Sequence, residues 1–156
     1  MNLTGMPPAQ APEQIVRNNG FYPDLNVAEL VENYAVPAQY GNNNGMMAQK
    51  LRLAIISVNK DLSLYWADNW PGDGTLAEVP SDDFEGQSLL VILYKHAVFS
   101  LAKSFLLTSS LGETHRDKAA VKAQESIDNE QHWLKQSNDA ISQMMNTSKN
   151  LSVALI

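Results

Sequence analysis

Apolar residues recur at helical spacing along one face of the segment 46–68. Six of them follow one another at intervals of three or four positions: Met47, Leu51, Ile55, Val58, Leu62 and Tyr65. This periodicity predicts a helix whose apolar face packs on a core. A second apolar row lies off that face and consists of Met46, Leu53, Ile56 and Leu64. A helix that is apolar on more than one side needs either a deep position in its own fold or a neighbouring subunit.

The segment 89–107 is the most hydrophobic part of the chain and predicts the central helix of a bundle. Its length is near that needed to cross a bilayer. Lys95, His96 and Lys103 interrupt it, however, and each lysine at the centre of a membrane would cost about 2.5–3.5 kcal/mol. A buried core helix is therefore the better interpretation, and no membrane partner is expected.

Two further helices are predicted on either side of these segments. A short one is expected at about 27–34, because Asn26 followed by Glu29 is typical of a helix start. A long one is expected at about 117–145, with an apolar face that should complete the core: Ala120, Ile127, Trp133, Leu134, Ile141 and Met144. Three of these residues lie seven positions apart, as in a helix packed along a long partner.

The order of elements shows no alternation of strands and helices and no internal repeat. We therefore predict an all-α fold: a small bundle of three to four helices with long loops and extended N- and C-terminal arms. Residues 1–20 contain three prolines and little periodicity and should form an extended or flexible N-terminal arm. The helical domain is expected over 21–147, followed by a C-terminal docking tail at 148–156.

The C-terminal tail is too apolar for a free end and too short to form a core alone. Its apolar residues are Leu151, Val153, Leu155 and Ile156, and the first three alternate with Ser152 and Ala154, which predicts an extended strand. Such a segment can bind in a groove of another protein or fold back onto its own bundle. We expect docking to a neighbour and keep folding back as the alternative.

The distribution of charge adds one feature to this prediction, an acidic segment. The 156 residues carry a net charge of −6, which disfavours unspecific binding to DNA. Six acidic residues lie between positions 68 and 85, where the chain has no Lys or Arg: Asp68, Asp73, Glu78, Asp82, Asp83 and Glu85. We interpret this segment as an acidic loop that faces a channel or a basic partner surface.

Candidate chemistry is sparse. The chain has no cysteine, and its three histidines, His96, His115 and His132, fall on different predicted elements without the paired spacing of zinc helices. Asp82 and Asp83 lack the further ligands at fixed spacing that a cation site needs. The three tryptophans are more simply core or interface anchors than a ligand platform. We therefore expect no catalytic residue, no metal and no cofactor, and a protein that is not an enzyme.

Several short motifs occur in a recognisable order. Phe21-Tyr22-Pro23-Asp24 is followed by a helix carrying Ala54 to Trp66, then by Leu76-Ala77-Glu78-Val79-Pro80 and Gly86-Gln87-Ser88. Tyr94-Lys95-His96-Ala97-Val98 and the ending Val153-Ala154-Leu155-Ile156 complete the order. This layout, from Phe21 to Ile156, resembles the GPL family of phage head completion proteins, the head-to-tail connectors of contractile-tailed bacteriophages.

The resemblance implies a virion structural protein that assembles in the cytoplasm of the bacterial host. It would dock beneath the portal protein after DNA packaging, as a ring of copies that is typically twelve-fold in related connectors. The ring would provide the platform for a neck or tail terminator protein, and genomic DNA would pass through without specific binding. The alternative from the residues alone is an unrelated cytoplasmic helical adaptor that binds a partner peptide or helix in a groove.

Overall fold

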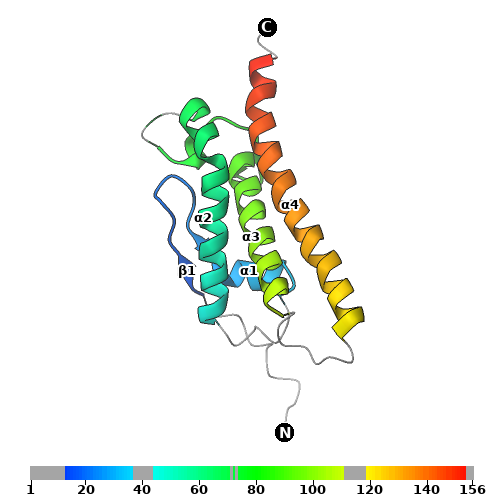
Figure 1. The fold of residues 1–156 in the computed structure, drawn as a ribbon. Coiled ribbons are helices and arrows are strands. Elements are labelled where there is room, and N and C mark those ends of the chain that lie inside the picture. Colours follow the sequence, from blue (N-terminus) through cyan, green and yellow to red (C-terminus); the bar gives the residue numbers. More distant parts are fainter. Residues whose placement is uncertain (1–12, 37–43, 71, 73, 111–118, 154–156) are drawn as a thin grey trace.

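The computed structural model describes residues 13–36, 44–70, 72, 74–110 and 119–153, and within the last helix it describes side chains only for 129–146. Four helices dominate the described residues, as predicted (Figure 1). The elements in chain order are β1 (Ile15–Val16), β2 (Leu25–Asn26), α1 (Val27–Asn33), α2 (Asn44–Asn69), the 3-10 turn η2 (Leu76–Glu78), β3 (Asp83–Phe84), β4 (Gln87–Ser88), α3 (Leu89–Ser110) and α4 (Ala119–Val153). The two pairs of short strands form antiparallel hairpins that the apolar pattern did not predict.

Helix α3 is the central helix, as its hydrophobicity predicts. It packs against both α2 and α4, and Leu90, Tyr94 and Leu106 are fully buried along it. By length and composition α3 could cross a membrane, but 61% of its most apolar window is buried inside the bundle. Lys103 is also buried: its Nζ donates to the carbonyl oxygen of Ala35 and lies 5.9 Å from the ring centre of Trp133. These contacts satisfy the ammonium group within a core helix.

Helix α2 buries the face that its first apolar row predicts. Met47, Leu51 and Val58 have no exposed surface, and they pack in one core with the aliphatic residues of α3. Asn69 ends the helix, and the backbone N–H of Trp70 then donates to the carbonyl oxygen of Trp66 at 2.9 Å. This face supplies one wall of the bundle.

Helix α4 buries part of the face that we expected. Ser137, Ala140, Ile141 and Met144 are buried, whereas Leu134 is 41% exposed. The prediction is therefore confirmed for Ile141 and Met144 and wrong for Leu134, and the side chains of Ala120 and Ile127 lie outside the described residues. Ser137 donates from Oγ to the carbonyl oxygen of Ala97 at 2.8 Å. Because this hydrogen bond satisfies the hydroxyl group, the small side chain of Ser137 can be buried where α4 packs closely on α3. The spacing of aliphatic residues did not predict this contact.

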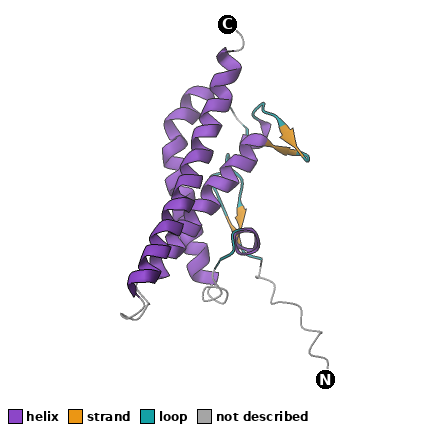
Figure 2. Cartoon of the chain, turned by 90° about the vertical axis from the view of Figure 1, so that its right-hand side faces the viewer, coloured by secondary structure: helices purple, strands orange, loops and turns teal. Residues whose placement is uncertain are grey.

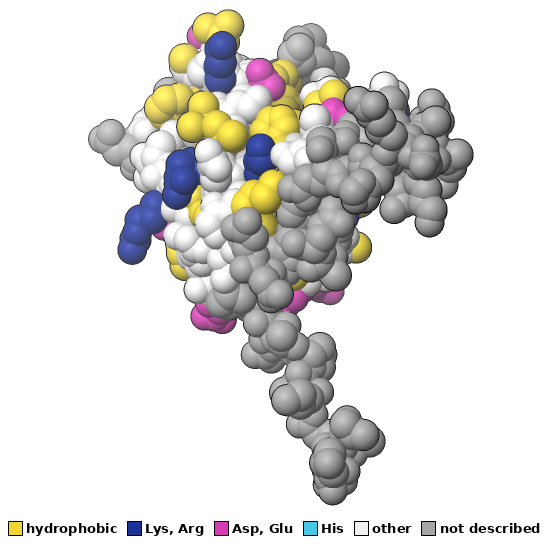
Figure 3. Space-filling model, turned by 60° about the horizontal axis from the view of Figure 1, so that its bottom comes forward, with side chains coloured by type: hydrophobic (Ala, Val, Ile, Leu, Met, Phe, Trp, Pro, Cys, Tyr) yellow, Lys and Arg dark blue, Asp and Glu magenta, His cyan; other side chains and the backbone are white. Residues whose placement is uncertain are grey.

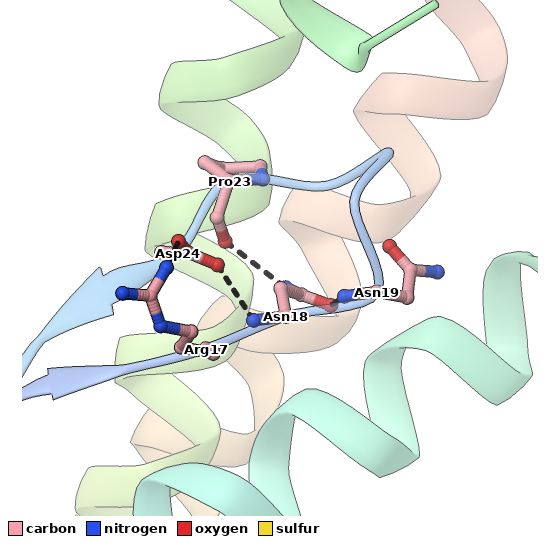
Figure 4. Close-up of polar contacts among 5 residues, drawn as sticks. All are labelled: Arg17, Asn18, Asn19, Pro23 and Asp24. Atoms are coloured by element: carbon pink, nitrogen blue, oxygen red, sulfur yellow. Dashed lines mark hydrogen bonds and ion pairs between the residues drawn. The ribbon is translucent and has the colours of Figure 1, made fainter. Parts of the chain in front are cut away.

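The folded domain begins before the boundary expected at residue 20. Val16 is buried on β1, and its strand pairs with Leu25–Asn26. The loop between the two strands is closed by polar contacts (Figure 4): Asn18 donates from its backbone nitrogen to Asp24 Oδ1 at 2.7 Å and from Nδ2 to the carbonyl oxygen of Pro23 at 3.0 Å. Residues 14–20 therefore belong to the bundle rather than to an arm.

The start of α1 matches the sequence signal, and the end of α4 does not. Asn26 Oδ1 accepts from the backbone N–H of Ala28 at 3.0 Å, which is the expected N-cap contact. By contrast, α4 continues as a helix through Val153, so the extended strand predicted for the tail is wrong over 148–153. No Gly or Pro interrupts the segment 119–153, so a brief apolar alternation does not end a helix that is already formed.

Candidate interaction surfaces

The acidic segment is spread over three elements. Asp68 lies near the end of α2, Glu78 in η2, and the other three described residues on and beside the β3–β4 hairpin; Asp73 lies outside the described residues. All five described side chains are exposed. The ion pairs found among the described residues involve other carboxylates: those of Asp24, Glu29 and Asp139. The acidic side chains are therefore free of cationic partners within the described chain.

The β3–β4 hairpin carries an aromatic side chain among these carboxylates. Glu85 and Gly86 form its turn, both with positive φ (51° and 80°), the backbone of a two-residue hairpin loop. Phe84 is 55% exposed between Asp83 and Glu85. Figure 2 shows the hairpin standing away from the helices at the start of α3.

Two contacts fix the base of this hairpin. The hydroxyl groups of Ser81 and Ser88 are 2.9 Å apart, and the backbone N–H of Leu89 donates to the carbonyl oxygen of Asp82 at 2.7 Å. Asp82 thus meets the start of α3 at Leu89 through its backbone. Sequence reasoning missed the hairpin, although Glu85-Gly86 between two short polar stretches was its available signal.

The second apolar row of α2 is on the surface. Leu53, Ile56 and Leu64 are 45%, 59% and 82% exposed, and Met46 is half-buried. Of the two explanations that the sequence left open for this row, a deep position is therefore excluded.

Basic side chains accompany this row. Lys50, Arg52 and Lys60 lie on the same helix, and α2 has no acidic residue between its start and Lys60. Figure 3 shows hydrophobic and Lys or Arg side chains next to one another on the face turned to the viewer. Over residues 44–60 the outer side of α2 is therefore apolar and basic, and the exposed Asp61 and Asp68 follow in its second half.

A groove of about 510 Å³ opens beside this outer side. It is lined by residues of α2, α3 and α4: Lys50, Leu53, Phe105, Thr108, Ser109 and Glu130. The volume is within the range of sites that hold small molecules or side chains. The groove lies at the C-terminal end of α3, whereas the hairpin precedes the N-terminal end of that helix.

A second cleft, of about 440 Å³, lies between α1, α3 and α4. In it Tyr34 Oη is 2.9 Å from His96 Nδ1, and His96 Nε2 is 3.2 Å from Gln136 Oε1. A neutral His96 that carries its proton on Nε2 satisfies both contacts. Burial, with a smaller contribution from the charge of Glu29, raises the pKa of Tyr34 to about 12.

The polar side chains in this cleft are held by contacts with one another. Both ring nitrogens of His96 are engaged, Tyr34 keeps its proton, and Glu29 pairs with Lys95 at 3.3 Å. His132 is exposed and packs edge-on against Trp133, and His115 lies outside the described residues. Within the described ranges, no three His, Cys, Asp or Glu residues come together as a metal site.

The tryptophans act as packing anchors. Trp70 is buried and Trp66 half-buried, and their rings lie 6.3 and 5.2 Å from that of Phe21. Trp133 is half-buried against Tyr34, with ring centres 5.7 Å apart. Trp70 and Trp66 are therefore packed in or against the core, whereas Trp133 forms part of the lining of the second cleft.

Comparison with known proteins decides the family. The family described as phage head completion protein (GPL) matches residues 16–156. The chain belongs to the phage head completion protein (GPL) family. This confirms the resemblance drawn from the short motifs, and the family is structural and non-enzymatic.

Two relatives carry names of the same kind. The chain is 27% identical over 124 residues to the probable head completion/stabilization protein of Haemophilus phage HP1, covering 74% of this chain and 79% of that protein. It is 26% identical over 117 residues to the head completion/stabilization protein of Escherichia phage P2, covering 71% of this chain and 62% of that protein. No solved structure matches the chain.

Proposed function

We propose that this member of the head completion family forms a ring beneath the portal after DNA packaging, and that the ring is the platform for neck and tail proteins. The observation that carries the proposal is the exposed apolar row of α2, Leu53, Ile56 and Leu64, on a chain of this family. A row of this kind is typical of a subunit whose surface is completed by a neighbour. The resemblance suggests twelve copies.

The acidic segment fits a conduit for DNA. Exposed carboxylates without cationic partners repel phosphates, whereas a basic wall would retain DNA through counterion release. We propose that this segment faces either the channel or a basic surface on an adjacent ring.

The C-terminal segment is the proposed contact with the portal. Leu151 and Val153 lie in the last turn of α4, and Leu155 and Ile156 follow it beyond the described residues. Because the last described core residue of α4 is Met144, with half-buried Met145 packed beside it, the end of the helix extends past the described core (Figure 1). A helical segment with apolar residues can bind in a groove of a partner.

Electron microscopy of the purified protein mixed with the portal of its phage tests the proposal. We expect rings coaxial with the portal. A variant carrying Leu53→Glu and Ile56→Glu should fold but form no ring, because it places two charges in the apolar row. Asn138→Glu, which adds a charge at an exposed position of α4, is the control. Copies bound singly, or no density beneath the portal, would contradict the proposal.

A further inference from the structure

We propose that Phe84, on the β3–β4 hairpin of one copy, inserts into the groove beside Leu53 of the next copy. This inference rests on the proposed ring, and it names the contact that joins neighbouring copies. It assigns the hairpin carboxylates to that contact and leaves Asp68 and Glu78 to face the channel.

The inserted element has the character of an interface anchor. Phe84 is 55% exposed on a hairpin held at its base by the two contacts described above. A large aromatic side chain on a fixed backbone loses little conformational freedom when it is buried in a partner. Asp82, Asp83 and Glu85 surround it with three negative charges that have no cationic partner in the described chain.

The groove is complementary to this element. Leu53 and Phe105 provide apolar walls for an aromatic ring, and Lys50 stands at the α2 side. Arg52 and Lys60 extend the positive charge along α2 beyond the groove. Glu130 is the acidic residue of the lining and belongs to the α4 wall, so we place the incoming carboxylates on the α2 side.

The positions of the two surfaces require contact between different copies. The hairpin directly precedes Leu89 at one end of α3, and Phe105 to Ser109 line the groove at its other end. A helix of this length separates them by about 25–30 Å at 1.5 Å per residue. The contact is therefore head-to-tail, which closes into a ring when the rotation between copies permits it.

The same geometry selects a second copy as the occupant. Pairing of two hairpins would bring like charges together, and pairing of two α2 faces would do the same with Lys50 and Lys60. Only the unlike surfaces are complementary in charge. Because those surfaces lie at opposite ends of α3, we expect the helices to be inclined to the axis of the ring.

Disulfide trapping tests the contact cleanly because the chain has no cysteine. Arg52→Cys and Glu85→Cys are made separately, both at exposed positions. The two proteins are mixed and oxidised, alone and with the portal, and the samples are imaged in parallel. We expect a dimer band from the mixture at about tenfold or more above the band from either protein alone, because only the mixture brings the two thiols together. Glu32→Cys, at an exposed position of α1, replaces Arg52→Cys as the control.

Each outcome decides between the interface and the ring. Rings without the cross-link would overturn the inference and leave the proposed function standing. The cross-link without coaxial rings would support the interface and contradict the function. A cross-link from Arg52→Cys to the portal rather than to a second copy, or neither rings nor a cross-link, would overturn the inference.

Phe84→Ala, introduced into the Glu85→Cys protein, tests the anchor itself. Because Phe84 is exposed in the single copy, the thermal unfolding midpoint should not change. The cross-link to Arg52→Cys should fall by about tenfold, the loss typical of an interface anchor. An unchanged cross-link would show that Phe84 does not enter the groove.

Discussion

At the scale of single residues, two stacked tyrosines in the core differ in their hydroxyl groups. The rings of Tyr22 and Tyr94 are 4.6 Å apart and nearly parallel, and both side chains are buried. Tyr94 Oη donates to Asn59 Oδ1 at 2.6 Å and accepts from Asn18 Nδ2 at 2.7 Å. Tyr22 Oη is buried without a partner among the described residues. The two rings are thus packed alike, but within the described residues only the hydroxyl group of Tyr94 is hydrogen-bonded.

This contrast predicts different effects for one conservative substitution. Tyr94→Phe leaves the amides of Asn18 and Asn59 without their shared partner and should lower the free energy of unfolding by about 1–3 kcal/mol. Tyr22→Phe removes an unsatisfied hydroxyl and should leave the stability unchanged or raise it. Urea denaturation followed by circular dichroism measures both. Equal losses in the two variants would contradict the hydrogen-bond assignment.

Burial of Tyr22 also predicts a dependence of stability on pH. Burial raises the pKa of Tyr22 to about 12, whereas an unfolded tyrosine ionises near the ordinary value of about 10. The folded state therefore holds more protons between these values, and its stability should fall as the pH rises from about 10 to 12. Tyr22→Phe should make that fall less steep in denaturation curves recorded across the window. An identical slope would mean that Tyr22 ionises as readily in the folded protein as in the unfolded one.

At the scale of elements, two adjacent residues of α4 test its register. Trp133 is half-buried against Tyr34 and Lys103, and Leu134 is 41% exposed. Trp133→Ala should cost near the lower end of the range of about 3–5 kcal/mol for tryptophans in cores. Leu134→Ala should cost well under that amount, because much of its side chain is already in water. Melting temperatures compare the two, and a larger loss from Leu134→Ala would restore the seven-residue register.

The end of α4 is the element proposed to reach the portal. Deleting residues 149–156 should leave a folded protein, because the described core of α4 ends with Met144 and the contact from Tyr65 Oη to the carbonyl oxygen of Met145. The truncated protein should no longer bind the portal in a pull-down. Unfolding of the truncated chain would mean that the tail belongs to the core, and normal portal binding would contradict the docking proposal.

At the scale of the whole molecule, the exposed charges should govern assembly rather than folding. Reversing Asp82 and Asp83 to Lys changes two side chains that have no ion pair among the described residues, so the isolated protein should remain folded. Assembly or DNA ejection should be impaired, because the surfaces that these charges face would become repulsive.

Particle yield and infectivity measure the effect of that reversal. Glu13→Lys with Glu32→Lys produces the same change in net charge at two other exposed positions and should be tolerated. Wild-type yield and infectivity in the Asp82 and Asp83 variant would count against a role for the acidic segment.

The sequence by itself determined the helices and the family. The core face of α2 and the central position of α3 follow from apolar spacing, because helix periodicity and burial are set by residues only a few positions apart. The capping residue Asn26 acts over two residues and is equally local. The short motifs were sufficient for the family, which the match over 16–156 confirms.

Only the tertiary structure decided which residues remain outside. Leu53 on α2 and Leu134 on α4 are aliphatic residues like those in the core, and their exposure depends on which neighbouring helix covers each face. Val16 joins the core because β1 pairs with a strand that follows a loop, and Phe84 is exposed because a two-residue turn carries it away from the helices. These outcomes depend on contacts between segments distant in sequence, which spacing along a single segment does not specify.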